Sequence, residues 1–215
     1  MRKLGPGTRL VVATHNKGKL NEFRDLLGPH GVELVSAGEL GLPEPAETGT
    51  LYAENALIKA RAATAATGLA AVADDSGLAI AALDGAPGLF TADWAGQPRD
   101  FAAAMARVDR ELGLRGVATA GARAHFVSAI ALTWPDGEEA IFEGRVFGTL
   151  AWPPRGAQGF GYDPMFVPDG FDKTFGEIDR QVKHGLPPHG EGLSHRARAF
   201  LRLAEAVLEK SGDKA

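Results

Sequence analysis

Short apolar runs alternate with longer amphipathic stretches in the first half of this chain. Residues 10–13 and 69–73 are uninterrupted apolar runs, which predict two buried strands. Leu and Phe recur at helical spacing over residues 20–27, and the Ala-rich segment 50–67 ends at Gly68, so two helices are expected there. The pattern therefore predicts strands interleaved with helices.

The second half of the chain adds a hairpin. Residues 125–133 and 139–147 are expected to be strands, and Pro135-Asp136-Gly137 between them is a turn signal. Helices are expected over residues 101–112 and, after Ser194 as N-cap, over the closing segment to residue 210. Because hairpin strands are antiparallel, we expect an α/β fold with a mixed sheet.

Composition limits the function classes. The chain has 215 residues, with 45% hydrophobic and 23% charged, and we expect a single domain over residues 1–215. The absence of cysteine excludes disulfides, thiolate catalysis and cysteine-based zinc sites. A net charge of −4 argues against binding a nucleic-acid polymer, and no apolar run suits a membrane span or a signal peptide. A cytoplasmic enzyme or binding protein is expected.

Two adjacent carboxylates are the most informative feature. Asp74 and Asp75 follow the apolar run 69–73 and precede Ser76 and Gly77. Oxygen ligands at the end of a buried strand suit a hard divalent cation, which can hold phosphates and activate water. The alternative is an ordinary turn, since Asp, Ser and Gly are turn formers.

A second polar segment joins the first strand to the first helix. Free backbone N–H groups at a helix start favour an anion, and Lys19 adds a positive charge there. The alternative is a solvated helix start on which Lys19 and Glu22 form a surface pair. In the Ala-rich helix, Asn55 and Lys59 share one face, and a solvated surface is again the alternative to a binding role.

The loop over residues 153–161 is rich in glycine and ends in an aromatic motif. Phe160 lies between Gly159 and Gly161, a placement that suits stacking on a planar base, and Asp163 can accept hydrogen bonds from ring N–H groups. The alternative is a hydrophobic plug in a turn. Arg196, at the start of the closing helix, can donate to carbonyl or phosphate oxygens.

Seven motifs in this order resemble one family, the Ham1-like inosine/xanthosine triphosphate pyrophosphatases, which hydrolyse deaminated purine nucleotides. The resemblance covers about residues 10–208, and the motifs are TxNxxKxxE at 14–22, ETGxxxxENAxxKA at 47–60, ADDSGL at 73–78, GAPG at 85–88, GFGYDPxF at 159–166, KTFGE at 173–177 and SHRARAF at 194–200.

This resemblance implies an elongated α/β fold with a long mixed sheet, two lobes and a central substrate cleft, an ordered core over about residues 9–209, a homodimer, and Mg²⁺ dependence. Asp75 would be the metal ligand and proton acceptor, with Asp74 and Glu47 as further metal ligands and Lys59 on a phosphate. The substrate-binding residues would be Thr14, His15, Asn16, Lys17, Gly18, Lys19, Ser76, Phe160, Gly161, Tyr162, Asp163, Lys183, His195 and Arg196.

The chain departs from the family pattern in two places. Many members carry two glutamates before Thr-Gly, whereas here Ala46 occupies the first place and only Glu47 remains, which leaves the second metal ligand open. The segment between Lys183 and Ser194 is also longer than in the shorter members, which makes the assignment of Lys183 less direct.

The expected activity is hydrolysis of ITP, dITP and XTP to the nucleoside monophosphate and pyrophosphate. Lys19 and Lys59 would stabilise the leaving group, and Arg196 would read the 6-keto edge of the purine. The alternatives are a pyrophosphatase for other modified nucleotides and a non-catalytic nucleotide-binding protein on the same fold.

Overall fold

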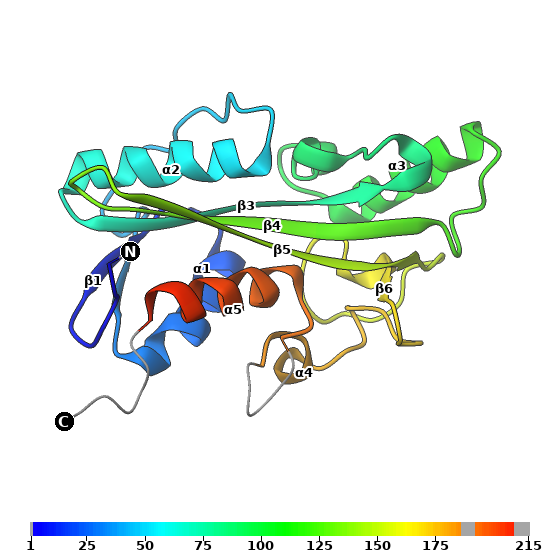
Figure 1. Cartoon of the computed structure of the whole chain (residues 1–215). Helices are drawn as coiled ribbons and strands as arrows, with labels where there is room; N and C mark the ends of the chain where they lie inside the picture. The colour runs from blue at the N-terminus through cyan, green and yellow to red at the C-terminus, as the bar shows by residue number, and fades with distance from the viewer. Residues whose placement is uncertain (1, 186–191, 209–215) are drawn as a thin grey trace. The chain divides into compact units, whose positions relative to one another are not determined.

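The computed structural model describes residues 2–185 and 192–208. Six strands form one mixed sheet in the order β2-β1-β3-β4-β5-β6 (Figure 1). They are β1 (Arg9–Val12), β2 (Glu33–Ser36), β3 (Ala70–Ile80), β4 (Arg123–Thr133), β5 (Glu139–Leu150) and β6 (Phe166–Pro168). Strand β1 pairs in parallel with both β2 and β3, whereas β5 and β6 are antiparallel. The predicted α/β class with a mixed sheet is confirmed.

Five α-helices accompany the sheet in the described ranges. They are α1 (Lys17–Leu27), α2 (Tyr52–Thr67), α3 (Phe101–Leu114), α4 (Arg180–His184) and α5 (His195–Val207). The sequence predicted all of them except the short α4. None of these helices is long and apolar enough to cross a membrane.

The chain divides into two compact units. The first contains residues 1–75, 128–144 and 196–215, and the second contains residues 76–127 and 145–195. The chain passes from one unit to the other within β3, β4 and β5. The expectation of a single domain stays a prediction.

Small side chains form one core of the first unit. Helix α2 packs through Ala56, Ala60 and Ala63 against Val11 and its neighbours on β1 and β3. Helices α1 and α5 lie on the other side of this part of the sheet (Figure 1). Strand β3 is therefore covered by helices on both faces, and polar groups at its centre need partners.

Aromatic and aliphatic side chains form the core of the second unit. Phe126, Phe166 and Phe175 lie together, with ring centroids 4.8–6.2 Å apart. Helix α3 adds Val108 and Leu112 to the same core. Tyr162 and Met165, which follow Phe160 in the chain, belong to the same core.

The predicted end of the second strand at Asp74 is wrong. Strand β3 continues without a break from Ala70 through Asp74, Asp75 and Ser76 to Ile80, so the turn interpretation of this segment is excluded. The hairpin is confirmed: β4 and β5 are neighbours joined by a turn in which Trp134 N donates to Glu138 O at 2.9 Å. No sequence pattern predicted the short strands β2 and β6. Residues 186–191, in the longer segment before Ser194, lie outside the described ranges, as do residues 209–210 of the predicted closing helix.

Candidate active site

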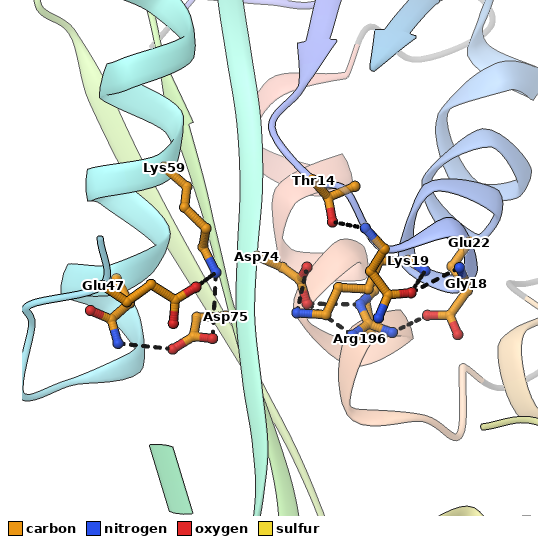
Figure 2. A network of polar contacts seen from close by, with 11 residues as sticks. Thr14, Gly18, Lys19, Glu22, Glu47, Lys59, Asp74, Asp75 and Arg196 are labelled. Atoms are coloured by element: carbon orange, nitrogen blue, oxygen red, sulfur yellow. Dashed lines mark hydrogen bonds and ion pairs between the residues drawn. The ribbon is translucent and has the colours of Figure 1, made fainter. Parts of the chain in front are cut away.

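Strand β3 sends its two aspartates to opposite faces of the sheet. Successive side chains of a strand alternate between faces, and both carboxylates are buried. Figure 2 shows Asp75 beside Lys59 and Glu47 on one side of the strand, and Asp74 beside Lys19 and Arg196 on the other. The two carboxylates therefore belong to separate groups of charges.

The group around Asp75 comes from α2 and the segment before it. Lys59 Nζ lies 2.8 Å from Glu47 Oε1 and 3.5 Å from Asp75 Oδ1. Asn55, one turn earlier on α2, donates from its amide to Asp75 Oδ2 at 3.3 Å. Lys59 and Asn55 are buried, so the solvated-surface interpretation of this helix face is wrong.

The start of α2 is built so that Asn55 reaches Asp75. Glu54 accepts hydrogen bonds from the backbone N–H groups of Thr50 and Leu51, which satisfies donors at the helix start. Asn55 Oδ1 accepts from Gly49 N at 2.8 Å. A Cβ at position 49 would lie 2.6 Å from Glu54 Cβ and 2.7 Å from Asn55 Oδ1, so only glycine fits.

The electrostatics of this group suit proton transfer. Burial raises the pKa of Asp75, and the nearby Lys59 ammonium only partly offsets this effect. Burial alone would lower the pKa of Lys59, but the negative charges of Asp75, Asp74 and Glu47 outweigh this effect and raise it. Lys59 therefore stays protonated, beside a carboxylate that is more basic than usual.

The group around Asp74 comes from α1 and α5. Arg196 donates from Nε and Nη2 to Asp74 Oδ2 at 3.0 and 2.8 Å, and from Nη1 to Glu22. Lys19 Nζ lies 3.2 Å from the other oxygen of Asp74, Oδ1. Glu22 is buried and pairs with Arg196, which excludes the predicted surface pair of Lys19 with Glu22.

Charge pairing dominates the Asp74 group. Burial alone would raise the pKa of Asp74, but the charges of Arg196 and Lys19 hold it well below its usual value. Burial likewise opposes the charge of Arg196, yet Asp74 and Glu22 raise the pKa of its guanidinium. For Lys19, burial prevails over the charge of Asp74 and lowers the pKa. Asp74 is thus a buried carboxylate that stays ionised.

The polar segment before α1 is capped from within. Asn16 is the N-cap of α1, and its Oδ1 accepts from the backbone N–H groups of Gly18 and Lys19 at 2.9 and 3.2 Å. Asn16 N in turn donates to Thr14 Oγ1 at 3.2 Å. The expected free N–H groups at Gly18 and Lys19 are therefore occupied, and the Lys19 side chain is the group placed to meet an anion. His15 and Lys17 are exposed beside this turn.

In the second unit, Asp163 fixes the loop that presents Phe160. Asp163 is buried, accepts from Phe160 N at 3.0 Å and forms an ion pair with Lys183. A Cβ at Gly159 would lie 2.0 Å from Asp163 Oδ2, so this turn requires glycine. Tyr162 is buried and donates to Thr91 O, whereas Phe160 keeps 40% of its surface exposed. Phe160 is thus an exposed ring on a supported loop, and the hydrophobic-plug interpretation is wrong.

His195 and Lys183 also contact aromatic rings. His195 is buried and stacks on Phe126, with centroids 4.9 Å apart and an interplanar angle of 14°. Lys183 Nζ lies 4.9 Å from the centre of the Phe175 ring, and Ser194 N donates to Lys183 O at 2.9 Å. These contacts fix both side chains in the second unit. Ser76 follows Asp75 in β3 and is half-buried.

The two groups on β3 differ in formal charge. Asp75 and Glu47 face one cation, Lys59, which leaves one net negative charge, whereas Asp74 and Glu22 are balanced by Lys19 and Arg196. A divalent cation therefore fits the Asp75 group, where the two carboxylates of Asp75 and Glu47 offer oxygen ligands. Within the described residues, no cluster of three or more His, Asp or Glu could form an all-protein metal cage. Two carboxylates plus substrate oxygens and water are nonetheless a usual Mg²⁺ environment.

Comparison with known proteins shows the family of this chain. The Ham1 family model matches residues 10–206, which contain both charge groups on β3 and the Phe160 loop. The chain belongs to the Ham1 family.

Individual relatives are similar to this chain over almost their whole length. A dITP/XTP pyrophosphatase of Bradyrhizobium sp. (strain BTAi1) is 60% identical over 203 residues, covering 94% of this chain and 95% of the relative. One from Brucella melitensis is 56% identical over 213 residues, covering 97% and 96%. Among solved structures, a HAM1 protein from Coxiella burnetii has a TM-score of 0.82 at 36% identity, covering 93% of this chain and 98% of that one.

In this Ham1-family chain, two residues of the charge groups were missing from the predicted site. Asn55 donates a hydrogen bond to Asp75, and Glu22 accepts one from Arg196. The helical spacing of Asn55 and Lys59 was a signal for the first. Nothing in the sequence links Glu22 to Arg196, which is 174 positions away.

Proposed function

We propose that this chain hydrolyses non-standard purine nucleoside triphosphates, namely dITP, ITP and XTP, to the nucleoside monophosphate and pyrophosphate. The observation that carries the proposal is the group on one face of β3, where the buried Asp75 meets Glu47, Asn55 and the protonated Lys59. Proteins named dITP/XTP pyrophosphatase at 55–60% identity support the same substrate class.

In this proposal Asp75 takes the proton from the attacking water. Its raised pKa makes it a better base than an exposed aspartate, and the Asn55 amide fixes its orientation. Mg²⁺, when bound, would neutralise charge on the phosphates and acidify a coordinated water. Asp75 and Glu47 would hold it, whereas Asp74 faces the other side of the sheet beside two cations and does not share that ion.

The cationic side chains would receive the triphosphate. Lys59 lies 2.8 Å from Glu47 and next to Asp75, so it can stabilise charge on the departing pyrophosphate. Lys19, on the other face of β3, keeps 16% of its side chain exposed and lies close enough for the charge of Lys59 to act on its pKa, so it can offer a second positive charge to the same triphosphate. Phe160 would stack on the purine base.

The test is pyrophosphate release from a panel of nucleotides with Mg²⁺. We expect dITP, ITP and XTP to be turned over far faster than ATP, GTP and modified pyrimidine or methylated nucleotides. Preference for any nucleotide other than dITP, ITP and XTP, GTP included, would replace the proposed substrate. Tight binding without turnover would make the protein a nucleotide sensor.

The homodimer and the cytoplasmic location stay predictions. Sedimentation equilibrium checks the homodimer.

Glu47→Gln should raise the Mg²⁺ concentration required for half-maximal activity by at least about 10-fold, because one of two carboxylate ligands is lost. Turnover at saturating Mg²⁺ should fall much less. Glu44→Gln, three residues earlier, is the matched control. An unchanged Mg²⁺ dependence in Glu47→Gln would remove Glu47 from the metal site.

Phe160→Ala should weaken binding of dITP and of the poor substrate dGTP by similar factors. Stacking on a base contributes about 1–3 kcal/mol and does not distinguish between purines. The KM values of the two substrates measure this effect, with Phe90→Ala, another exposed ring of the second unit, as the control. A loss confined to dITP would mean that Phe160 reads the base edge instead.

A further inference from the structure

Four buried or half-buried charged side chains form a closed ring in the first unit. Lys19 contacts Asp74 Oδ1, Arg196 contacts Asp74 Oδ2, and Arg196 also contacts Glu22. Lys19 and Glu22 stand three positions apart on α1, so the helix itself closes the ring (Figure 2). Signs alternate around the ring, and it joins the first turn of α1 to β3 and to the start of α5.

We propose that this ring positions Lys19 for the triphosphate, with Asp74 as the positioning residue and Arg196 and Glu22 as its supports. The proposal rests on the proposed function, because it assigns Lys19 to the phosphates. In this arrangement Asp74 binds no metal and contacts no reacting atom. It holds Lys19 from one oxygen while its other oxygen is held by two N–H groups of Arg196.

The geometry favours positioning over helix packing alone. Arg196 is 1% exposed, so its charge is fixed deep in the first unit, and two donors from one guanidinium restrict the rotation of the Asp74 carboxylate. Asp74 Oδ1 is buried and accepts no hydrogen bond within the described residues, and its contact with Lys19 Nζ, at 3.2 Å, is an ion pair. Among the four side chains, Lys19 is the one that reaches solvent appreciably, since the side chains of the other three are at most 6% exposed. The three inner side chains of the ring are therefore fixed, and Lys19 is its most exposed member.

The balance of charge supports the same conclusion. Two carboxylates and two cations leave the ring formally neutral, so a bound metal ion is not required to stabilise Asp74. A long flexible lysine loses side-chain entropy when it is immobilised by a ligand. Because Asp74 holds Lys19 before substrate arrives, much of this entropy is already lost, and triphosphate binding is tighter.

The experiment measures binding of a non-hydrolysable dITP analogue, with a methylene bridge between the α and β phosphates, in the presence of EDTA. Asp74→Asn should weaken its binding about 2- to 10-fold, the range for immobilising one long side chain, and should leave binding of dIMP nearly unchanged. In a Lys19→Met background the same Asp74→Asn change should have no further effect. Asp169→Asn, which alters an exposed pair with Arg123, is the matched control.

Several results would overturn the proposal. They are unchanged affinity for the analogue in Asp74→Asn, equal weakening of dIMP, and additive effects of Asp74→Asn and Lys19→Met. If Asp74→Asn fails to fold, Glu22→Gln gives the same test, because it loosens Arg196 and should also weaken the triphosphate analogue but not dIMP. Wild-type protein that binds the analogue but releases no pyrophosphate from dITP would contradict the proposed function and leave the ring proposal standing.

Discussion

Asp75→Asn is expected to reduce kcat for dITP hydrolysis by at least about 10²-fold while the protein stays folded. Removal of a general base alone has an effect of this size, and the same change removes an oxygen ligand for Mg²⁺. The melting temperature should not fall. Burial makes the ionised form of Asp75 costly in the folded protein, so a neutral amide of the same shape is tolerated there.

Pyrophosphate release and a thermal melt on the same preparation check this prediction. Asp84→Asn makes the same chemical change in an exposed pair with Arg115 and should retain full activity. Near-normal turnover in a folded Asp75→Asn protein would contradict the assignment of Asp75 as the general base. A large loss in the Asp84→Asn control would instead point to a general effect of the preparation.

Arg196→Met should cost about 3–5 kcal/mol in the free energy of unfolding, because it leaves Asp74 and Glu22 buried without their cation. For a chain of this size the melting temperature should fall by about 6–20 °C. The change at Arg61, whose exposed guanidinium pairs with Glu139, is the matched control, and Arg61→Met should cost at most about 1 kcal/mol.

The difference between wild type and Arg196→Met should depend on pH. In wild type the pKa of Asp74 lies below its unfolded value, so its contribution to stability is full above about pH 4 and is lost as the pH falls. The variant lacks most of this contribution. Its stability should therefore approach that of wild type between pH 4 and pH 2, as measured by urea unfolding. A constant difference across this range would mean that Arg196 stabilises by packing alone.

Arg196 was also predicted to read the purine edge, and this role stays a prediction. The guanidinium already donates to two carboxylates of the first unit, so its first effect is on stability. The dITP:dATP ratio of kcat/KM in Arg196→Met, measured below its melting temperature, separates the two roles. An unchanged ratio leaves Arg196 as a supporting residue.

Local patterns predicted most of the helices because each carries its own signal. Helix α2 is Ala-rich and ends at Gly68, which adopts a φ of 67° that glycine tolerates. The end of β3 was misplaced for the opposite reason. Asp74, Asp75 and Gly77 disfavour a strand locally, but β1 and β4 flank β3 in the sheet, and its buried carboxylates find partners on both sides.

The charge groups were only partly predictable. Asp75, Lys59 and Glu47 were recognised through their motifs, and the structure brings them together. The separation of Asp74 from Asp75 follows from strand alternation, which the sequence did not indicate once the strand was expected to end before them. The partnership of Glu22 with Arg196 depends on tertiary packing alone. Sequence spacing carries no information about contacts of that kind.

Because the side chains of β3 alternate between the two faces of the sheet, this strand should not tolerate insertions or deletions. Parallel pairing aligns Leu10 with Ala70 and Val12 with Val72, which fixes the faces that the two aspartates occupy. One residue removed between Val72 and Asp74 would move Asp75 into the position of Asp74, beside Lys19, and one residue added would move Asp74 into the position of Asp75, beside Lys59. A change of two residues would restore the faces but displace both carboxylates along the strand. Length changes here should abolish activity, whereas the turn at residues 134–138, whose Asp136 forms an exposed ion pair with Arg2, can absorb them.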